Sequence, residues 1–128
     1  MSNIKYTHKV NSHAEAAALY AEGTGDVVRL GYNTYLDRLF DDYIVVHHST
    51  PIICFHSDGS ATLDAAYVSR TTAGRLHYFK PEMVASVGSH IARDGQWYNV
   101  RLLDHPGDFQ IDLGERYRIF PDKTVVKV

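Results

Sequence analysis

Three histidines and the only cysteine of the chain fall within ten residues, in the segment IVVHHSTPIICFH. Neutral imidazole and thiolate are good ligands for zinc or copper. If Thr50-Pro51 forms a two-residue hairpin loop, His47, Cys54 and His56 share one face of the hairpin, with cross-strand Cβ atoms about 5 Å apart. The same register places His48 on the apolar face. The segment therefore predicts a hairpin whose candidate metal ligands are His47, Cys54 and His56.

The alternative for this hairpin is that its histidines and cysteine only pack. Histidine tolerates a half-buried strand position, and cysteine often behaves as a small buried hydrophobe. The sequence contains no CxxC, HxxxH or HExxH spacing that would support a metal site. A slip of one residue in register would also separate His47 from Cys54. We therefore expect no metal and no other cofactor.

The segment SRTTAGR is the strongest candidate for an anion site. Thr71 or Thr72 is expected to cap a short helix, with Arg70 before it and Arg75 on its first turn. A helix N-terminus offers free N–H groups and the positive end of the helix dipole, which suit phosphate, and arginine adds bidentate geometry. The simpler alternative is that the threonines only cap the helix and the arginines pair with local acids such as Asp64.

Aromatic residues gather in the segment YNTYLDRLFDDY. Tyr32, Tyr35 and Tyr43 are candidates for stacking on the bases of a single strand. The aspartates of the same segment would repel a phosphate backbone, and the net charge of −2 gives no general attraction for nucleic acid. We favour an edge strand with a solvated acidic turn and keep nucleic-acid binding as an alternative.

Catalytic signatures are scarce in the rest of the chain. The sequence has no GxSxG, P-loop or GxGxxG motif, and its DHPGD segment is typical of a turn. Catalytic triads assemble from distant positions, so this absence does not exclude an enzyme. A small hydrolase or nuclease that uses His48 or His56 remains the second alternative.

Two short helices are expected. Ser12 and Glu15 have the spacing of a capping box, in which each side chain satisfies the other's backbone N–H, and alanines follow. This predicts a helix at about 13–22 that Gly23 ends in a left-handed conformation. A second helix is expected at about 72–80, ahead of Pro81.

The other elements are expected to be strands. Residues 4–10 alternate polar and apolar side chains, and short segments rich in β-branched and aromatic residues follow from 26 onward, separated by turn residues. Asp58-Gly59 and Asp94-Gly95 indicate hairpins, the former through a type I′ turn. We predict a single α+β domain over residues 1–128, with a mostly antiparallel sheet built from hairpins and one or two short helices.

Residues 27–79 resemble a widespread group of small bacteriophage-encoded proteins with no assigned activity. The group's pattern is roughly N-T-Y-L, L-H-x-T-D-V-V-T-F, D-G-x-x-T-L-x-S-G-G and R-T-x-T-T-K-x-R-I. The matching residues are Asn33, Thr34, Tyr35, Leu36, His48, Thr50, Phe55, Asp58, Gly59, Thr62, Leu63, Arg70, Thr71, Thr72 and Arg75. The resemblance implies an origin in a phage or prophage and an accessory role. It adds Asn33, Tyr35 and His48 to the candidate ligand-binding residues.

The chain also departs from that pattern. Pro51 replaces an aspartate, Ala73 replaces a lysine, and Ala65-Ala66-Tyr67 replaces Ser-Gly-Gly. His47 stands where the group has an apolar residue, and Cys54 stands where it tends to have threonine. The resemblance therefore retains His48 and lowers the expectation of a metal site.

Length and composition complete the expectations. The 128 residues contain no apolar run near the ~20 residues that span a bilayer, and the N-terminus lacks the apolar segment of a signal peptide. We expect a non-enzymatic binding protein in the cytoplasm of the host cell. Its expected partner is a host component, either a defence protein or a nucleotide-type small molecule. Self-association through an exposed edge strand is a further option.

Overall fold

The computed structural model describes residues 6–23 and 27–128, which form two helices and ten strands. The helices are α1 (His13–Glu22) and α2 (Arg70–Tyr78). The strands are β1 (Val28–Gly31), β2 (Thr34–Leu39), β3 (Asp42–His47), β4 (Thr50–Phe55), β5 (Ala61–Asp64), β6 (Val84–Ala92), β7 (Gly95–Leu102), β8 (Asp108–Asp112), β9 (Arg116–Ile119) and β10 (Val125–Lys127). The predicted α+β class with a mostly antiparallel sheet is confirmed. No helix in the described ranges is long and apolar enough to cross a membrane.

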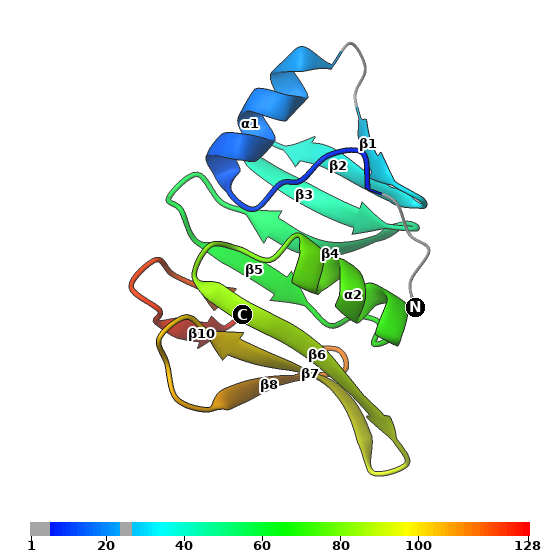
Figure 1. Ribbon diagram of the computed structural model, residues 1–128, viewed down its shortest axis with the longest axis vertical. Coiled ribbons are helices and arrows are strands. Elements are labelled where there is room, and N and C mark those ends of the chain that lie inside the picture. Colours follow the sequence, from blue (N-terminus) through cyan, green and yellow to red (C-terminus); the bar gives the residue numbers. More distant parts are fainter. Residues whose placement is uncertain (1–5, 24–26) are drawn as a thin grey trace.

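The strands form two antiparallel sheets (Figure 1). The larger sheet has the order β1-β2-β3-β4-β5-β9-β10, and the smaller one has the order β6-β7-β8. The first five strands follow the chain as a meander. The chain then leaves the sheet to form α2 and the smaller sheet, and it returns as β9 beside β5.

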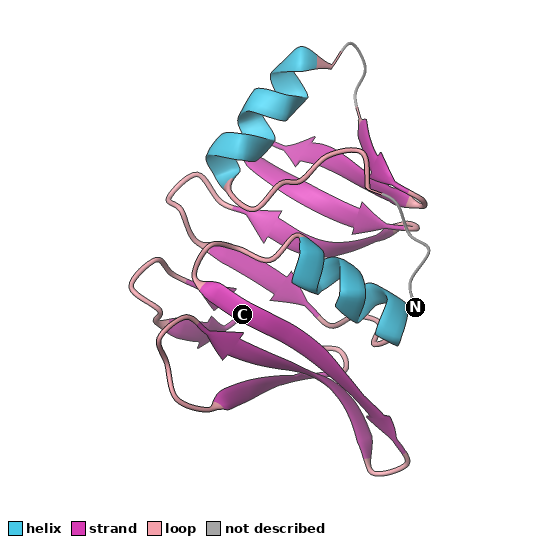
Figure 2. Cartoon of the chain, viewed as in Figure 1, coloured by secondary structure: helices cyan, strands magenta, loops and turns pink. Residues whose placement is uncertain are grey.

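Both helices lie on one side of the larger sheet (Figure 2). α1 packs against β2 and β3, and α2 packs against β4 and β6. One hydrophobic core contains residues of both sheets and both helices, among them Leu36, Ile53, Leu76 and Val100. The face of the larger sheet that carries these buried residues is called the inner face below, and the opposite face is called the outer face.

The first helix matches its prediction except at its ends. The Ser12 hydroxyl accepts from the Glu15 N–H at 3.1 Å, as the capping box requires. The Glu15 carboxylate instead reaches the N–H of Asn11, one residue before the cap. The expected left-handed conformation of Gly23 is wrong, because its φ is −77°. A Cβ at Gly23 would lie 3.2 Å from a methyl group of Val28, so close approach rather than backbone handedness favours glycine there.

The second helix begins earlier than expected. Ser69, not Thr71 or Thr72, is the N-cap, and its hydroxyl accepts from the Thr72 N–H at 3.0 Å. The helix therefore covers Arg70–Tyr78 rather than 72–80. This shift of about half a turn moves Arg75 from the first turn to the helix interior, where it is buried.

The β3–β4 hairpin has a different register from the one expected. Its turn is His48-Ser49, with His48 in the left-handed region at a φ of 58°. Pro51 has no N–H for the ladder, and the register shifts next to it, so that Val45 pairs with Ile53 while Val46 pairs with Pro51. Consequently His47 faces inward, Cys54 faces outward, and His48 is exposed rather than beside Ile53.

Two smaller expectations also need correction. The strand expected at 4–10 is wrong over the described residues 6–10, where only Tyr6 forms an isolated bridge, to Gly31. Residues 4 and 5 lie outside the described residues. The hairpin at Asp58-Gly59 is present, but only Gly59 has a positive φ, of 89°, so the turn is not type I′.

Candidate functional site

A cavity of about 380 Å³ lies between the β3–β4 turn and the start of α2. We call it the α2 cavity. It is lined by His47, His48, Thr50, Ile52, Tyr67, Ser69, Thr71 and Thr72. Its volume is within the range of small-molecule sites, about 300 to 1,000 Å³.

A chain of hydroxyl groups fixes the imidazole of His47 in this cavity. The Ser69 hydroxyl donates to Thr72 Oγ1 at 2.8 Å, and Thr72 Oγ1 lies 3.0 Å from His47 Nδ1. When the Thr72 hydroxyl donates to Nδ1, neutral His47 carries its proton on Nε2, and when Nδ1 donates to Thr72, Nε2 is an acceptor. His47 Nε2 has no hydrogen-bond partner among the described residues, although the side chain is only 5% exposed. This nitrogen is therefore available to form a hydrogen bond with a ligand.

Burial keeps His47 neutral. Desolvation is the main cause that lowers its pKa to about 4, and the positive charges of Arg75 and of His48 act in the same direction. The His48 ring lies 4.4 Å from the His47 ring, centroid to centroid. At neutral pH, His47 is therefore a hydrogen-bonding group without charge.

The exposed His48 is held in place by its backbone. Its N–H donates to the carbonyl oxygen of Asn33 at 2.7 Å. Asn33 belongs to the β1–β2 turn and has a φ of 50°, a conformation that asparagine tolerates better than most residues. The two turns thus support each other at the rim of the α2 cavity.

None of the described residues that line the α2 cavity is acidic. Two arginines lie near it, Arg70 at the start of α2 and Arg75 inside the protein. The first-turn N–H groups of Arg70 and Thr71 have no acceptor among the described residues. The Arg70 side chain is exposed at the same helix end and forms no ion pair in the described part of the chain. A helix N-terminus with such a side chain favours an anion.

The buried Arg75 adds to this field from inside the protein. It is 1% exposed, and its guanidinium donates only to neutral oxygens. These are Thr34 Oγ1 at 2.6 Å, the Tyr32 carbonyl at 2.9 Å and the Thr71 carbonyl at 3.3 Å. Burial lowers the pKa of Arg75 from its usual value, but a guanidinium stays charged in proteins. The charge therefore has no carboxylate partner among the described residues.

The structure brings together part of the sequence-predicted site. His48, Thr71 and Thr72 line the cavity, and the Asn33 carbonyl accepts from the His48 N–H. Arg70 lies between the lining residues Ser69 and Thr71 in the chain but is not part of the lining. The prediction that Arg75 contacts the ligand directly is wrong. Its guanidinium is buried and donates to Thr34 Oγ1 and the Tyr32 carbonyl. Tyr35 lies on the outer face, since its neighbours Thr34 and Leu36 are both buried on the inner face.

Sequence reasoning missed Ser69, Tyr67 and the inward side chain of His47. Ser69 precedes the expected caps and is itself a preferred N-cap residue, so its type was a usable signal. Tyr67 is 61% exposed beside the cavity, and only the tertiary structure places it there. The expected ion pairs between the arginines and Asp64 are not formed in the described part of the chain, where Asp64 caps the N–H of Ala66.

A larger cavity of about 580 Å³ lies between the start of α1 and the loops before β6 and after β9. Two of its polar side chains, those of Asn11 and His13, are already committed to the fold. Asn11 donates to the carbonyls of Tyr78 and Lys80, and His13 Nε2 bonds the Asp41 carbonyl. The larger cavity is lined by the acidic Glu82, whereas no acidic residue lines the α2 cavity among the described residues, so we take the α2 cavity as the candidate site for an anion.

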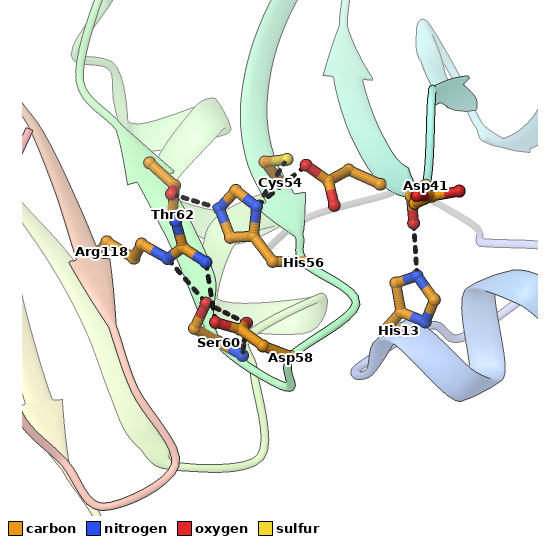
Figure 3. A network of polar contacts seen from close by, with 9 residues as sticks. His13, Asp41, Cys54, His56, Asp58, Ser60, Thr62 and Arg118 are labelled. Carbon is orange, nitrogen blue, oxygen red and sulfur yellow. Dashed lines mark hydrogen bonds and ion pairs between the residues drawn. The ribbon is translucent and has the colours of Figure 1, made fainter.

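The predicted metal ligands His47, Cys54 and His56 do not meet, because His47 is on the inner face. Cys54 and His56 do meet on the outer face, and Asp42 takes the third place (Figure 3). His56 Nδ1 lies 3.0 Å from Asp42 Oδ2 and 3.8 Å from Cys54 Sγ. We call these three residues the outer-face cluster.

The surroundings of the outer-face cluster are polar and ordered. His56 Nε2 lies 2.7 Å from Thr62 Oγ1 on β5. Arg118 on β9 donates to Ser60 Oγ at 2.7 Å and to Asp58 Oδ2 at 2.9 Å (Figure 3). A cavity of about 400 Å³ opens over the cluster. Burial and the nearby Asp42 carboxylate raise the pKa of the Cys54 thiol to about 11, so Cys54 is not an activated nucleophile.

No family model, curated protein sequence or solved structure matches the chain. The geometry of the α2 cavity and of the outer-face cluster is therefore the basis on which a function is proposed.

Proposed function

We propose that this chain is a non-enzymatic binding protein and that the α2 cavity holds a small anionic ligand of nucleotide type. The observation that carries the proposal is the charge of the cavity. Arg70, the free N–H groups of the α2 N-terminus and the buried Arg75 all favour an anion, and no acidic residue lines the cavity. Opposite charge within a few ångströms is the main attraction for a phosphate.

The remaining lining groups suit the other parts of a nucleotide. His47 Nε2 and the Thr71 hydroxyl offer neutral hydrogen bonds. The exposed ring of Tyr67 offers a surface on which a base can stack. An apolar side chain, Ile52, contributes to the floor. A few polar groups around an otherwise neutral surface are typical of a small-molecule site.

A binding role fits this chemistry better than hydrolysis. With its pKa near 4, His47 is a weak base at neutral pH, and its Nδ1 is already bonded to Thr72. A general base works best with a pKa near the working pH. No carboxylate lines the cavity to orient the imidazole or a water. Of the histidines in the hydrolase alternative, His56 is bonded to Asp42 and Thr62 on the outer face. His48 has no carboxylate beside it among the described residues that line the cavity. We therefore prefer a binding protein to a small hydrolase or nuclease.

Nucleic-acid binding also has weaker support than a small ligand. The proposed stacking set is wrong for Tyr43, which is 8% exposed and belongs to the core. Tyr35 lies on the outer face, whereas Tyr32 is 64% exposed in the β1–β2 turn. The three rings do not form one platform for successive bases, which single-strand binders need.

The biological setting is proposed from the resemblance alone. The match over residues 27–79 implies a phage or prophage origin and an accessory role, and on that basis we propose that the protein engages a host component in the host cytoplasm. A nucleotide signal of the host is the component that suits the α2 cavity. For the rest of the surface, we propose a host defence protein or a second copy of the chain as the partner.

The test is direct binding by calorimetry to adenosine and guanosine mono-, di- and triphosphates and to cyclic dinucleotides. We expect one member to bind with one site per chain, and Arg70→Ala to weaken it by about tenfold or more, since a charge-assisted bond is lost. Arg93→Ala, at the exposed β6–β7 turn, is the matched control and should bind like the wild type. Because Arg70 is exposed, unfolding should be unchanged.

Two results would overturn the proposal. One is that no nucleotide of the panel binds the wild type. The other is that Arg70→Ala and Arg93→Ala bind with the same affinity as the wild type, which would place the ligand elsewhere. Hydrolysis of a bound nucleotide, followed by phosphate release, would instead favour the enzyme alternative.

A further inference from the structure

The outer-face cluster has the donor set of a metal centre. It combines one carboxylate, one thiol and one imidazole, and its three ligand atoms all lie within 4.8 Å of one another. Thiolate and imidazole are ligands of zinc and other borderline metals, whereas Mg²⁺ and Ca²⁺ take oxygen ligands. The chemistry of the cluster therefore selects against the hard cations.

The separations also fit a tetrahedral ion. With Zn–S near 2.3 Å and Zn–N and Zn–O near 2.0 to 2.1 Å, tetrahedral angles give an N–S edge of about 3.6 Å and an N–O edge of about 3.3 Å. The observed distances from His56 Nδ1 are 3.8 Å to Cys54 Sγ and 3.0 Å to Asp42 Oδ2. These two edges differ from the tetrahedral values by only a few tenths of an ångström, and the third, between Asp42 and Cys54, is within 4.8 Å.

The backbone explains why these three residues converge. Cys54 and His56 are two residues apart, so they project from the same face of the extended chain. Asp42 precedes Tyr43, which pairs with Phe55, so Asp42 lies across from His56. The register shift beside Pro51 turns Cys54 to the outer face, where it is opposite Ile44. Asp42 and Cys54 thus lie on paired strands, and His56 directly follows β4, so the cluster is held more firmly than one on a long loop.

The proposed metal ligands already have hydrogen-bond partners that would orient them. Ligating histidines usually donate their other ring N–H to a fixed acceptor, and His56 Nε2 has Thr62 Oγ1 at 2.7 Å. The neighbouring cation, Arg118, is paired with Asp58 at 2.9 Å rather than with Asp42. The Asp42 carboxylate therefore contacts only His56 among the ion pairs of the described residues.

We propose that Asp42 Oδ2, Cys54 Sγ and His56 Nδ1 bind one Zn²⁺ ion, with the fourth position open to the cavity of about 400 Å³ above the cluster. On binding, the Cys54 S–H bond breaks, its proton goes to solvent and the thiolate bonds the ion. The His56 proton resides on Nε2, where it is donated to Thr62. Three protein ligands and one open position are the arrangement in which zinc takes water or an anionic group.

The first test is metal affinity, measured by competition with a chromophoric chelator. We expect one tight Zn²⁺ per chain, and Cys54→Ser, His56→Gln and Asp42→Asn should each weaken it by about tenfold or more. His90→Gln is the matched control, because His90 and Asp94 also form a histidine–aspartate pair, at 3.2 Å, without a cysteine. His90→Gln should leave the affinity unchanged. Equal affinity of all four variants and the wild type would overturn the proposal.

The second test needs no variant. Co²⁺ in place of Zn²⁺ should give the charge-transfer absorption of a cobalt–thiolate bond, because Cys54 is the only cysteine. One equivalent of Zn²⁺ should also slow alkylation of Cys54 in the folded wild type by about tenfold or more, since the metal occupies the thiolate. A cobalt spectrum without that band, or alkylation unchanged by Zn²⁺, would show that the metal binds only other histidines and would overturn the proposal.

Discussion

At the scale of single residues, His47 shows how a buried polar group is accommodated. Its Nδ1 is bonded to Thr72, its ring is almost fully buried, and the Arg75 charge is close enough to lower its pKa. Each of these contacts favours the neutral imidazole. A group that is neutral when folded and charges more easily when unfolded makes stability depend on pH.

The first prediction concerns this dependence. The imidazole of His47 has a pKa near 6.5 in the unfolded chain and about 4 in the folded protein. The unfolded chain therefore takes up a proton that the folded protein refuses as pH falls from about 6.5 to about 4. The contribution of neutral His47 to the free energy of unfolding is complete above pH 6.5. It is lost as pH falls from about 6.5 to about 4, and the loss is at most about 3 kcal/mol.

The measurement is urea unfolding of the wild type and of His47→Gln at several pH values between 4.5 and 7.5. Carboxylates and the other histidines titrate in both proteins, so the difference between the two curves isolates His47. We expect the gap in stability between them to narrow as pH falls. A gap that is constant over the window would show that His47 is protonated equally in both states.

At the scale of elements, sequence patterns predicted most strands well. Segments rich in β-branched and aromatic residues were expected from 26 onward, and β1 to β10 lie there, because most of these strands are short and are separated by turn residues. The patterns did not predict the β3–β4 register, since the bulge at Pro51 depends on which neighbouring residues the core accepts. A shift of one residue exchanges the faces of a strand, so the metal trio was wrong in His47 and right in pairing Cys54 with His56.

Only some residues of the α2 cavity were predictable from the sequence. Thr71 and Thr72 were found because their segment has the residue types of a helix start, although Ser69 is the N-cap, and His48 was added by the resemblance. Arg75 and Tyr35 were not placed correctly, because burial and sheet face are properties of the tertiary structure. Asp42 has no signal in the sequence beyond its being the first residue of a strand.

The second prediction concerns the turn between β2 and β3. Phe40 has a φ of 55° and is 87% exposed, so it bears the strain of a left-handed backbone without burying its ring. Phe40→Gly should relieve the contact of Cβ with the backbone and stabilise the protein by about 1 kcal/mol, after the entropic cost of glycine. The measurement is the free energy of unfolding from chemical denaturation.

The control for that prediction is Arg93→Gly in the β6–β7 turn. Arg93 is exposed and does not have a positive φ, so glycine there gains nothing and costs about 0.5 to 1 kcal/mol. If Phe40→Gly destabilised the protein as much as Arg93→Gly does, the strain assigned to Phe40 would be absent.

At the scale of the whole molecule, the smaller sheet is tied to the α2 cavity by Tyr98. This side chain lies in the middle of β7 and is 1% exposed. Its hydroxyl donates to the Tyr67 carbonyl at 2.7 Å and accepts from the Ser69 N–H at 3.3 Å. Tyr67 and Ser69 both line the cavity, so the smaller sheet positions one wall of it.

The third prediction tests this link. Tyr98→Phe keeps the ring in the core and removes only the hydroxyl, which leaves the Tyr67 carbonyl and the Ser69 N–H without a partner. Unmade hydrogen bonds of buried groups cost about 1 to 3 kcal/mol, and we expect a loss of about 2 kcal/mol in chemical denaturation. Tyr117→Phe is the control, because its hydroxyl has no hydrogen bond among the described residues while its ring packs on Phe109. Equal stability of the two variants would show that the loop before α2 is held by its other contacts, and that the smaller sheet does not shape the α2 cavity.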